Sequence, residues 1–506
     1  MCGIAGIDRA EARHEVEQML NQLRHRGPDG SGLDSAAGCT LGHTRLAIID
    51  VAGGHQPIFS EQHAITFNGE VYNHRALRQR HLPDRPLHTR TDTEVILHLY
   101  QRYGPRCVEL LDGMFALAIA GPDGLFLARD PIGIKPLYTA HRGDTLYFAS
   151  EIKALKDVAA DIREFPPGHW YHSRLGLSRY YTVGQDLSAL EGNIVQELMH
   201  FEHEDQVLPV IVRTLRDAVH KRLMSDVPLG ISLSGGLDSS IVALLARDGL
   251  ERLETFAVGV AGSNDLAAAR EVAHFLGTRH HERVYDQQDM QRVLPHVLRF
   301  LESFDPALVR SAIPNYFLAQ LSAEYVKVFL TGEGADELYA GYDYLERFEE
   351  PDALHSELVH IVSTLHNTNL QRADRMSMAH GLEARVPFLD LRSIALALGL
   401  PALWKLRGEG RPAKTLLRRA FADALPAPIV NRPKEKFSQG AGSADLIARV
   451  AEETIGEAEF AAERTRLAQT WNYPLANKEA LYYYRSLRES YQDDHIFPTM
   501  GHSRSL

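Results

Sequence analysis

Residues 232–240, with the sequence SLSGGLDSS, have the composition of a loop that binds phosphate groups. Glycine lets the backbone approach a ligand closely, the hydroxyls of Ser234, Ser239 and Ser240 can donate hydrogen bonds, and the N-terminus of a following helix carries partial positive charge. The loop lacks the lysine of a Walker loop, and it does not match G-x-G-x-x-G. The sequence therefore predicts a phosphate cradle of a different nucleotide-binding class.

Cys2 is the second candidate, because removal of Met1 would make it the N-terminal residue. The free α-amine, with a pKa of about 8, could then accept the proton of the thiol. If Met1 stayed attached, only ammonia-dependent chemistry would remain. Polar residues of the types that an amide-cleaving site needs follow in residues 26–30 (RGPDG), at Arg45, in residues 68–70 (NGE) and at Asp92.

Short apolar segments separated by Gly, Pro and Asp turns predict the elements that position Cys2 and its partners. The expected strands are 39–50, 64–72, 114–120, 124–128 and 145–149. Residues 12–25 and 93–103 repeat apolar side chains at helical spacing. This pattern indicates a layered α+β domain that ends near residue 182.

The phosphate loop belongs to a second region in which strands and helices alternate. The apolar stretch 229–233 leads into the loop and the helix 239–247 follows it. A helix at 208–224, a strand at 255–260, a helix at 265–276 and a strand at 326–330 continue the alternation, which favours a parallel α/β sheet. Beyond residue 340 the pattern is mostly helical.

A linker is expected at 184–205, where the apolar periodicity weakens. Its end, HFEHED, contains side chains of the metal-ligating types, namely His200, Glu202, His203 and Asp205. A run of charged residues is usually a solvated surface, so no metal site is predicted there.

The composition excludes several other classes of protein. The 506 residues are 44% hydrophobic and 24% charged, as in ordinary globular proteins, and exceed what one core usually supports. The formal net charge of −12 gives no general attraction to nucleic acid or anionic lipid. Three cysteines are too few for a disulfide framework, and no signal peptide or membrane span is recognisable, so a cytoplasmic enzyme of small molecules is expected.

The first 180 or so residues resemble the class II, N-terminal-nucleophile, glutamine amidotransferases. The resemblance implies a four-layer αββα domain in which Cys2 attacks the glutamine amide while Asn68 and Gly69 form the oxyanion hole. It further implies that Arg45 pairs with the glutamine carboxylate, that Glu70 and Asp92 bind its ammonium group, and that backbone groups of Ile48 and Ile49 line the pocket.

The loop SGGLDSS resembles that of the ATP pyrophosphatases, and a glutaminase followed by this loop resembles the asparagine synthetase family. Further segments agree in order and spacing: 256–259 (FAVG), 331–337 (TGEGADE), 383–390 (EARVPFLD) and 434–438 (KEKFS). The implied fold is a parallel-sheet α/β ATP pyrophosphatase domain with added helices. The implied domains are 2–183 and 206–506, and a homodimer is the assembly expected by resemblance.

The resemblance also assigns roles in the second domain. The implied ATP-binding residues are Leu233, Ser234, Gly235, Gly236, Asp238, Ser239, Val258, Thr331 and Gly332. Asp238 and Asp336 would hold Mg²⁺ on the triphosphate, since that ion prefers oxygen ligands. Glu333 would assist the attack of ammonia on an acyl-adenylate, and Lys434 would stabilise charge on the reacting phosphate.

The acceptor carboxylate is the least determined part of the reaction. Arg310 and Arg385 are present where the family pattern expects acceptor-binding residues, which favours aspartate and hence a glutamine-dependent asparagine synthetase. Asparagine-forming members typically have two threonines where Ala307 and Leu308 stand here, and an acidic residue in place of Gln439. The alternatives are the same chemistry on another carboxylate and a catalytically silent metabolite-binding homologue.

Overall fold

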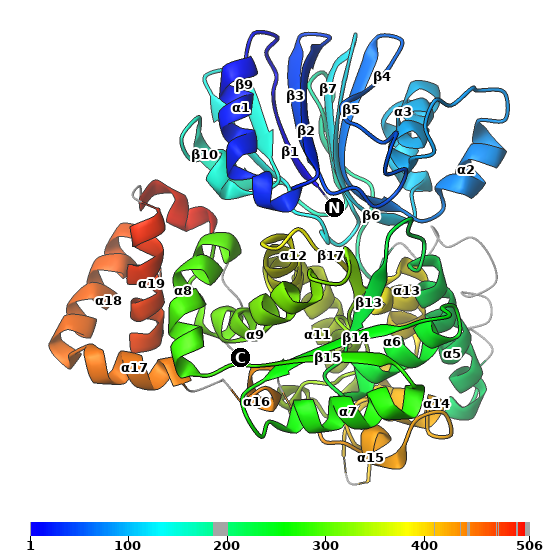
Figure 1. Ribbon diagram of the computed structural model, residues 1–506, viewed down its shortest axis with the longest axis vertical. Helices are drawn as coiled ribbons and strands as arrows, with labels where there is room; N and C mark the ends of the chain where they lie inside the picture. The colour runs from blue at the N-terminus through cyan, green and yellow to red at the C-terminus, as the bar shows by residue number, and fades with distance from the viewer. Residues whose placement is uncertain are drawn as a thin grey trace.

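The computed structural model describes residues 2–185, 201–408, 410–435, 437–442, 446–471, 473, 475–491 and 494–500. It has two lobes, with two stacked sheets and their helices in the N-terminal lobe and a third sheet surrounded by helices in the C-terminal lobe (Figure 1). Most of the expected linker 184–205 lies outside the described residues, which resume at residue 201.

The N-terminal lobe contains two six-stranded sheets whose neighbouring strands are all antiparallel. The first has the order β10 (Ala160–Glu164), β8 (Tyr138–Arg142), β9 (Thr145–Ala149), β1 (Gly3–Ile7), β3 (Cys39–Arg45) and β2 (Gly30–Ala36). The second has the order β12 (Gly176–Arg179), β11 (His169–His172), β7 (Gly124–Arg129), β6 (Gly113–Gly121), β5 (His63–Val71) and β4 (Ile58–Ser60).

Helices cover the outer faces of both sheets. Alternate side chains such as Ile4, Leu41 and Leu127 fill the space between the sheets, because successive residues of a strand point to opposite faces. Helix α1 (Arg13–Gln22) packs on β1 and β3, and α3 (Asp92–Tyr103) packs on β5. These layers confirm the predicted αββα arrangement.

The C-terminal lobe is built on a five-stranded parallel sheet. Its order is β15 (Arg279–Val284), β14 (Glu254–Gly259), β13 (Leu229–Ser232), β16 (Val328–Leu330) and β17 (Glu383–Arg385). The surrounding helices include α5 (Glu204–Lys221), α6 (Leu237–Arg247), α7 (Asn264–Leu276), α8 (Gln287–Leu301) and α9 (Pro306–Ser322). Because β13 and β16 are parallel neighbours, the loops that follow them meet at the same edge, where ligands bind in open α/β sheets.

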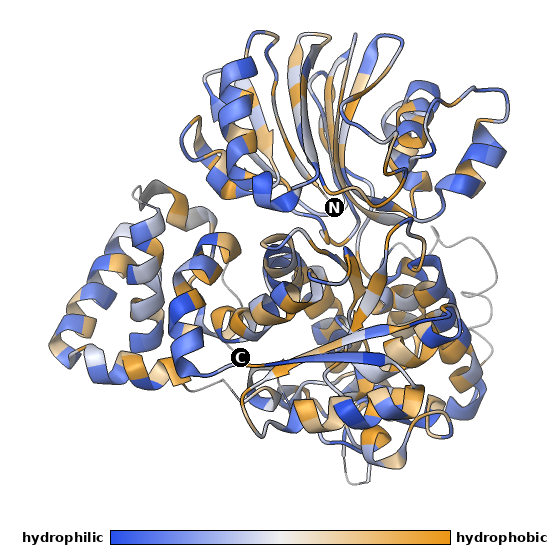
Figure 2. Ribbon diagram, in the orientation of Figure 1, coloured by the Kyte–Doolittle hydropathy of each residue, from blue (hydrophilic) through white to orange (hydrophobic). Residues whose placement is uncertain are grey.

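The chain beyond residue 340 is mostly helical, as predicted. Its main helices are α11 (Pro351–Ser363), α12 (Asn369–Met378), α13 (Leu391–Gly399), α14 (Thr415–Ala420), α17 (Leu446–Thr454), α18 (Glu457–Trp471) and α19 (Lys478–Ser490). Hydrophobic residues gather along the strands and on the inner sides of the helices (Figure 2). Within the described ranges, none of the helices has the length and apolarity needed to cross a membrane.

Candidate active sites

The two stacked sheets of the N-terminal lobe bring Cys2 next to Asn68. Cys2 directly precedes β1, which pairs with β3 so that Gly3 lies opposite Thr44. Strand β5 of the other sheet carries Asn68, whose Oδ1 accepts a hydrogen bond from the Cys2 backbone N–H at 2.9 Å. The Cys2 side chain is buried, with 8% of its surface exposed.

The Asn68 amide is held in one orientation but keeps one unused donor. Its Nδ2 is buried and has no hydrogen-bond partner among the described residues. An unpaired buried donor is costly and calls for an explanation, and a donor fixed beside a nucleophile suits the oxyanion of an acyl-transfer reaction. The next residue, Gly69, approaches β6 so closely that a Cβ atom would lie 2.0 Å from the carbonyl oxygen of Met114.

Burial raises the pKa of the Cys2 thiol, although the positive charge of Arg45 opposes this shift. The thiol is therefore protonated at neutral pH. A nearby base must remove the proton before the sulfur can act as a nucleophile.

Arg45 and Asp92 are both fixed by backbone groups. The Arg45 guanidinium donates to the carbonyl oxygens of Asp50 at 2.8 Å and Val51 at 3.0 Å. The Asp92 carboxylate, at the start of α3, accepts hydrogen bonds from the backbone N–H groups of Val71 and Thr93, each at 2.8 Å. Both side chains are nearly fully buried.

Glu70 is the carboxylate of this site that most needs a cation. Burial raises its pKa well above the usual value, and the charges of Glu383 and Asp92 add to the effect. Its Oε1 lies 3.7 Å from Arg385, while its Oε2 has no hydrogen-bond partner among the described residues. An ammonium group placed here would relieve both the desolvation and the repulsion.

The two isoleucines contribute less directly. Ile48 is buried, and its carbonyl oxygen already accepts a hydrogen bond from the Asp226 N–H at 3.1 Å. Ile49 is partly buried against the core of the C-terminal lobe.

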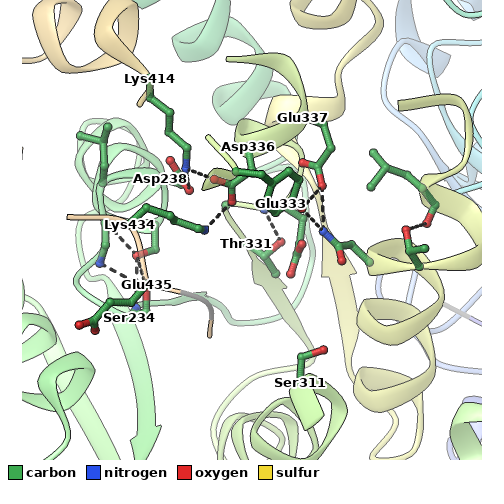
Figure 3. A pocket seen from close by; sticks show the side chains of 18 of the residues that line it. Ser234, Asp238, Ser311, Thr331, Glu333, Asp336, Glu337, Lys414, Lys434 and Glu435 are labelled. Atoms are coloured by element: carbon green, nitrogen blue, oxygen red, sulfur yellow. Dashed lines mark hydrogen bonds and ion pairs between the residues drawn. The ribbon is translucent and has the colours of Figure 1, made fainter. Parts of the chain in front are cut away.

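A cavity of about 400 Å³ lies at the carboxyl ends of β13 and β16 (Figure 3). Nine of the predicted residues line it: Ser234, Gly236, Asp238, Ser239, Thr331, Gly332, Glu333, Asp336 and Lys434. Leu233 and Val258 are buried in the core beside the cavity and do not line it. Gly235 does not line it either, but it shapes the turn.

The turn after β13 has the geometry of an anion cradle. Gly235 has a φ of +69°, and a Cβ atom there would lie 2.3 Å from the carbonyl carbon of Ala268. The Ser239 hydroxyl accepts a hydrogen bond from the Ser234 N–H at 3.2 Å, and the Ser240 hydroxyl donates to the Gly236 carbonyl at 2.8 Å. Helix α6 then begins at Leu237, and its first turn, which has N–H groups without a partner inside the helix, lines the cavity.

Two lysines and two aspartates alternate across the cavity. The Lys414 ammonium lies 2.5 Å from Asp238 and 2.6 Å from Asp336, and Lys434 lies 2.5 Å from the other oxygen of Asp336 (Figure 3). Burial alone would raise the pKa of Asp336, but the two ammonium groups outweigh it and hold the pKa well below the usual range. The same attraction raises the pKa of Lys434 despite its burial.

Glu333 faces the cavity and contacts Arg372 of α12. Arg372 also donates to the Ser311 hydroxyl of α9 at 3.2 Å. The Arg372 guanidinium thus contacts both Glu333, the residue expected to assist the attack of ammonia, and the cavity wall formed by α9.

Neither of the arginines predicted to bind the acceptor lines this cavity. The Arg310 side chain turns outward from α9 and pairs with Glu479, with Nε 2.9 Å from Oε1. Arg385 is fully buried beneath the glutaminase lobe, where it donates to Glu383 at 2.6 Å and to the Met224 carbonyl at 2.6 Å. Ala307 and Leu308 do line the cavity, whereas exposed Gln439 does not.

Several residues of the cavity were not predicted, above all Lys414, Arg372 and Glu337. Lys414 sits in a turn with a φ of +59° before α14 and belongs to no recognisable motif. Helix α12 did carry a signal, because Arg372, Asp374 and Arg375 lie within four positions of one another, and all three are buried. Several buried charges on one helix indicate that it has ionic or functional partners.

Comparison with known proteins shows that the domains containing the two sites match two known families. Residues 1–164 match the glutamine amidotransferase domain family, and residues 211–351 and 346–495 match the asparagine synthase family. A glutamine-hydrolysing asparagine synthetase of Arabidopsis thaliana is 41% identical over 471 residues, covering 87% of this chain and 79% of the relative. Asparagine synthetase B of Escherichia coli is 37% identical, covering 97% and 91%, and a Sandersonia aurantiaca asparagine synthetase is 39% identical, covering 87% of each.

Proposed function

The chain belongs to the family of glutamine-hydrolysing asparagine synthetases, and we propose that it transfers ammonia from glutamine to the side-chain carboxylate of aspartate with ATP as the energy source. The observation that carries this proposal is the presence in one chain of the Cys2–Asn68 pair and of the phosphate cradle with its lysine–aspartate cluster.

In the N-terminal lobe, the α-amine of Cys2 would take the thiol proton once Met1 is removed. The thiolate adds to the glutamine amide carbon, and the Asn68 Nδ2 and the Gly69 N–H stabilise the oxyanion. The proton passes to the leaving nitrogen, ammonia departs, and water hydrolyses the thioester to glutamate. Arg45 would orient the glutamine carboxylate, and Glu70 and Asp92 its ammonium group.

In the C-terminal lobe, an acceptor carboxylate oxygen attacks the α-phosphorus of ATP and pyrophosphate leaves. The Ser234–Ser239 turn would hold the departing phosphates while Lys434 stabilises their charge. Ammonia then attacks the acyl carbon and AMP leaves, with Glu333 as the acceptor of an ammonia proton. Lys414 would join Lys434 in binding the phosphates, since both ammonium groups face the cavity.

Asp238 and Asp336 fit the role of magnesium ligands. The Oδ1 atom of Asp238 is buried without a hydrogen-bond partner among the described residues, and both carboxylates face the Lys414 ammonium group. Carboxylate oxygens suit a hard divalent cation, which would neutralise charge on the triphosphate.

Arg372 is the guanidinium that we propose for the acceptor, in place of Arg310 and Arg385. It lies in the cavity between Ser311 and Glu333, so a carboxylate bound there would be near the candidate base. Ala307 and Leu308 make the adjacent wall apolar, which keeps other carboxylates as the alternative acceptors.

The organisation proposed for the chain is a glutaminase domain at 2–183, a linker at 184–205 and a synthetase domain at 206–506. The family matches at 1–164 and 211–495 support these limits. A homodimer and a cytoplasmic location complete the proposal.

Replacement of the nucleophile tests the division of labour. We expect Cys2→Ala to abolish asparagine formation from glutamine and to leave formation from ammonium chloride within about twofold of wild type, because the second site lies in another lobe. Cys39→Ala, which removes a buried thiol away from Asn68, should retain both activities. Undiminished use of glutamine by the Cys2→Ala enzyme would refute the assignment.

The acceptor is tested by pyrophosphate release with ATP, Mg²⁺ and glutamine. Aspartate-dependent release with asparagine as the product supports aspartate. Release with another carboxylate and none with aspartate would support the alternative.

A further inference from the structure

A second cavity, of about 430 Å³, lies on the glutaminase lobe between α2 (His74–His81) and the loop that leads into α3. Arg75 and Arg78 of α2 and Arg90 of the loop line it. None of the residues proposed to bind glutamine lines this cavity, so it is a separate site. In Figure 1, α2 and α3 lie at one side of the N-terminal lobe.

The charge of this region contrasts with that of the whole chain. The sequence of α2, HRALRQRH, has three arginines, two histidines and no acidic residue, in a protein of net charge −12. The helix is correspondingly hydrophilic in Figure 2. Arg75 and Arg78 are three residues apart, so their like charges lie on the same face of the helix, which is unfavourable without a counter-charge.

The protein supplies little counter-charge within this cavity. Arg75 and Arg78 are exposed, and they have no hydrogen-bond or ion-pair partner in the described part of the chain. By contrast, the nearby Arg85 pairs with Glu61 at 3.0 Å. The buried Glu94 carboxylate does not line the cavity, and it accepts the N–H groups of His88 and Thr89.

Arg90 supplies a third guanidinium, and its backbone is held in place independently of its side chain. Its side chain is 78% exposed and lies 3.7 Å from Asp50, but its backbone N–H donates to the other Asp50 oxygen at 2.9 Å. The guanidinium can therefore turn to a ligand while the loop stays in place. Leu87 and Val95 form an apolar part of the wall.

We propose that this cavity binds a small phosphate-bearing anion. The guanidinium fork matches the geometry of phosphate oxygens, and three such groups line one cavity. The volume is that of a small-molecule site, and the apolar wall leaves room for an organic group on the phosphate. The site adjoins the glutamine pocket, because Asp50 contacts Arg90 and its carbonyl oxygen holds Arg45.

Calorimetric titration of the full chain tests the proposal with two probes. Glycerol 3-phosphate represents phosphate monoesters, and inorganic pyrophosphate represents free phosphates, which also enter the ATP cavity. We expect at least one of the two probes to bind saturably, with one molecule per chain, at a site that requires the arginines of α2. The double variant Arg75→Ala/Arg78→Ala should bind this probe molecule at least tenfold more weakly, because two charge-assisted contacts are lost.

Arg80→Ala is the matched control, since Arg80 is an exposed arginine of the same helix that does not line the cavity. This variant should bind both probes as the wild type does. The proposal is overturned if neither probe binds wild type outside the ATP cavity, or if the double variant and Arg80→Ala bind equally. Thermal unfolding of both variants confirms that the comparison is made between folded proteins.

Discussion

Glu337 is a buried carboxylate that the lysine–aspartate cluster leaves without a cation of its own. It lies in the ATP cavity next to Asp336, and its Oε1 accepts hydrogen bonds from the Tyr342 hydroxyl and from Asn369, the latter at 2.9 Å. Its Oε2 has no partner among the described residues. Burial, followed by the charge of Asp336, raises the pKa of Glu337 to about 7.

The raised pKa predicts a pH-dependent gain in stability for Glu337→Gln. The unfolded chain ionises this group near its ordinary value of 4.5, whereas the folded chain keeps its proton up to about pH 7. Between these values the folded state binds more protons, so wild-type stability falls as the pH rises. We expect the variant to match wild type near pH 4.5 and to exceed it by about 3 kcal/mol above pH 7.

Denaturant unfolding at several pH values measures this difference. Glu349→Gln, which changes an exposed carboxylate of the same lobe, is the matched control. A constant difference for Glu337→Gln across the same range would contradict the raised pKa.

At the residue scale, the sequence was most informative where function depends on neighbours in the chain. The SGGLDSS loop could be predicted because one strand–turn–helix segment contains the whole cradle. Arg372 and Lys414 could not, because they reach the cavity only through the packing of α12 and of the turn before α14. The distance of Arg385 from the cavity lining could not be predicted either, since a motif does not say which side of the sheet a buried guanidinium faces.

At the scale of elements, β13, the Gly235 turn and α6 act as a unit, and the turn determines where the helix N-terminus points. Gly235 combines a left-handed φ with contact to the backbone of α7. We expect Gly235→Ala to lower ammonium-dependent asparagine formation by at least tenfold, because the added Cβ must displace the cradle. Glutamine hydrolysis should stay within about twofold of wild type.

Both activities can be measured on the same preparation, by pyrophosphate and glutamate release. Gly456→Ala is the control, since a Cβ atom there meets no heavy atom within 4 Å. Equal losses of synthesis in the two variants would show that the turn does not need glycine.

Two of the strands that were not predicted have weak apolar patterns. Strand β15 reads RHHERV and is only partly buried, because it forms an edge of the parallel sheet and has one strand neighbour. Strand β17 is only three residues long and is defined by its pairing with β16. The central strands β13 and β14 were predicted, since burial on both faces gives them continuous apolar runs.

At the scale of the whole molecule, a buried network of charges joins the two lobes. Arg26 of the glutaminase lobe is fully buried, and its guanidinium lies 2.7 Å from Glu151 and 2.8 Å from Asp374 of α12. Its Nε also donates to the Cys2 carbonyl at 3.0 Å. One side chain therefore contacts the nucleophilic residue and the helix that carries Arg372.

Removal of the synthetase-lobe partner tests this connection. We expect Asp374→Ala to lower the free energy of unfolding by about 3–5 kcal/mol, since a buried guanidinium loses one of its two carboxylates. Glutamine-dependent synthesis should fall more than ammonium-dependent synthesis, because Arg26 also positions the Cys2 backbone. Asp123→Ala breaks an exposed ion pair with Arg174 and should cost less than about 1 kcal/mol. If the Asp374 variant unfolded like the Asp123 variant and lost both activities equally, the network would not connect the nucleophile to α12.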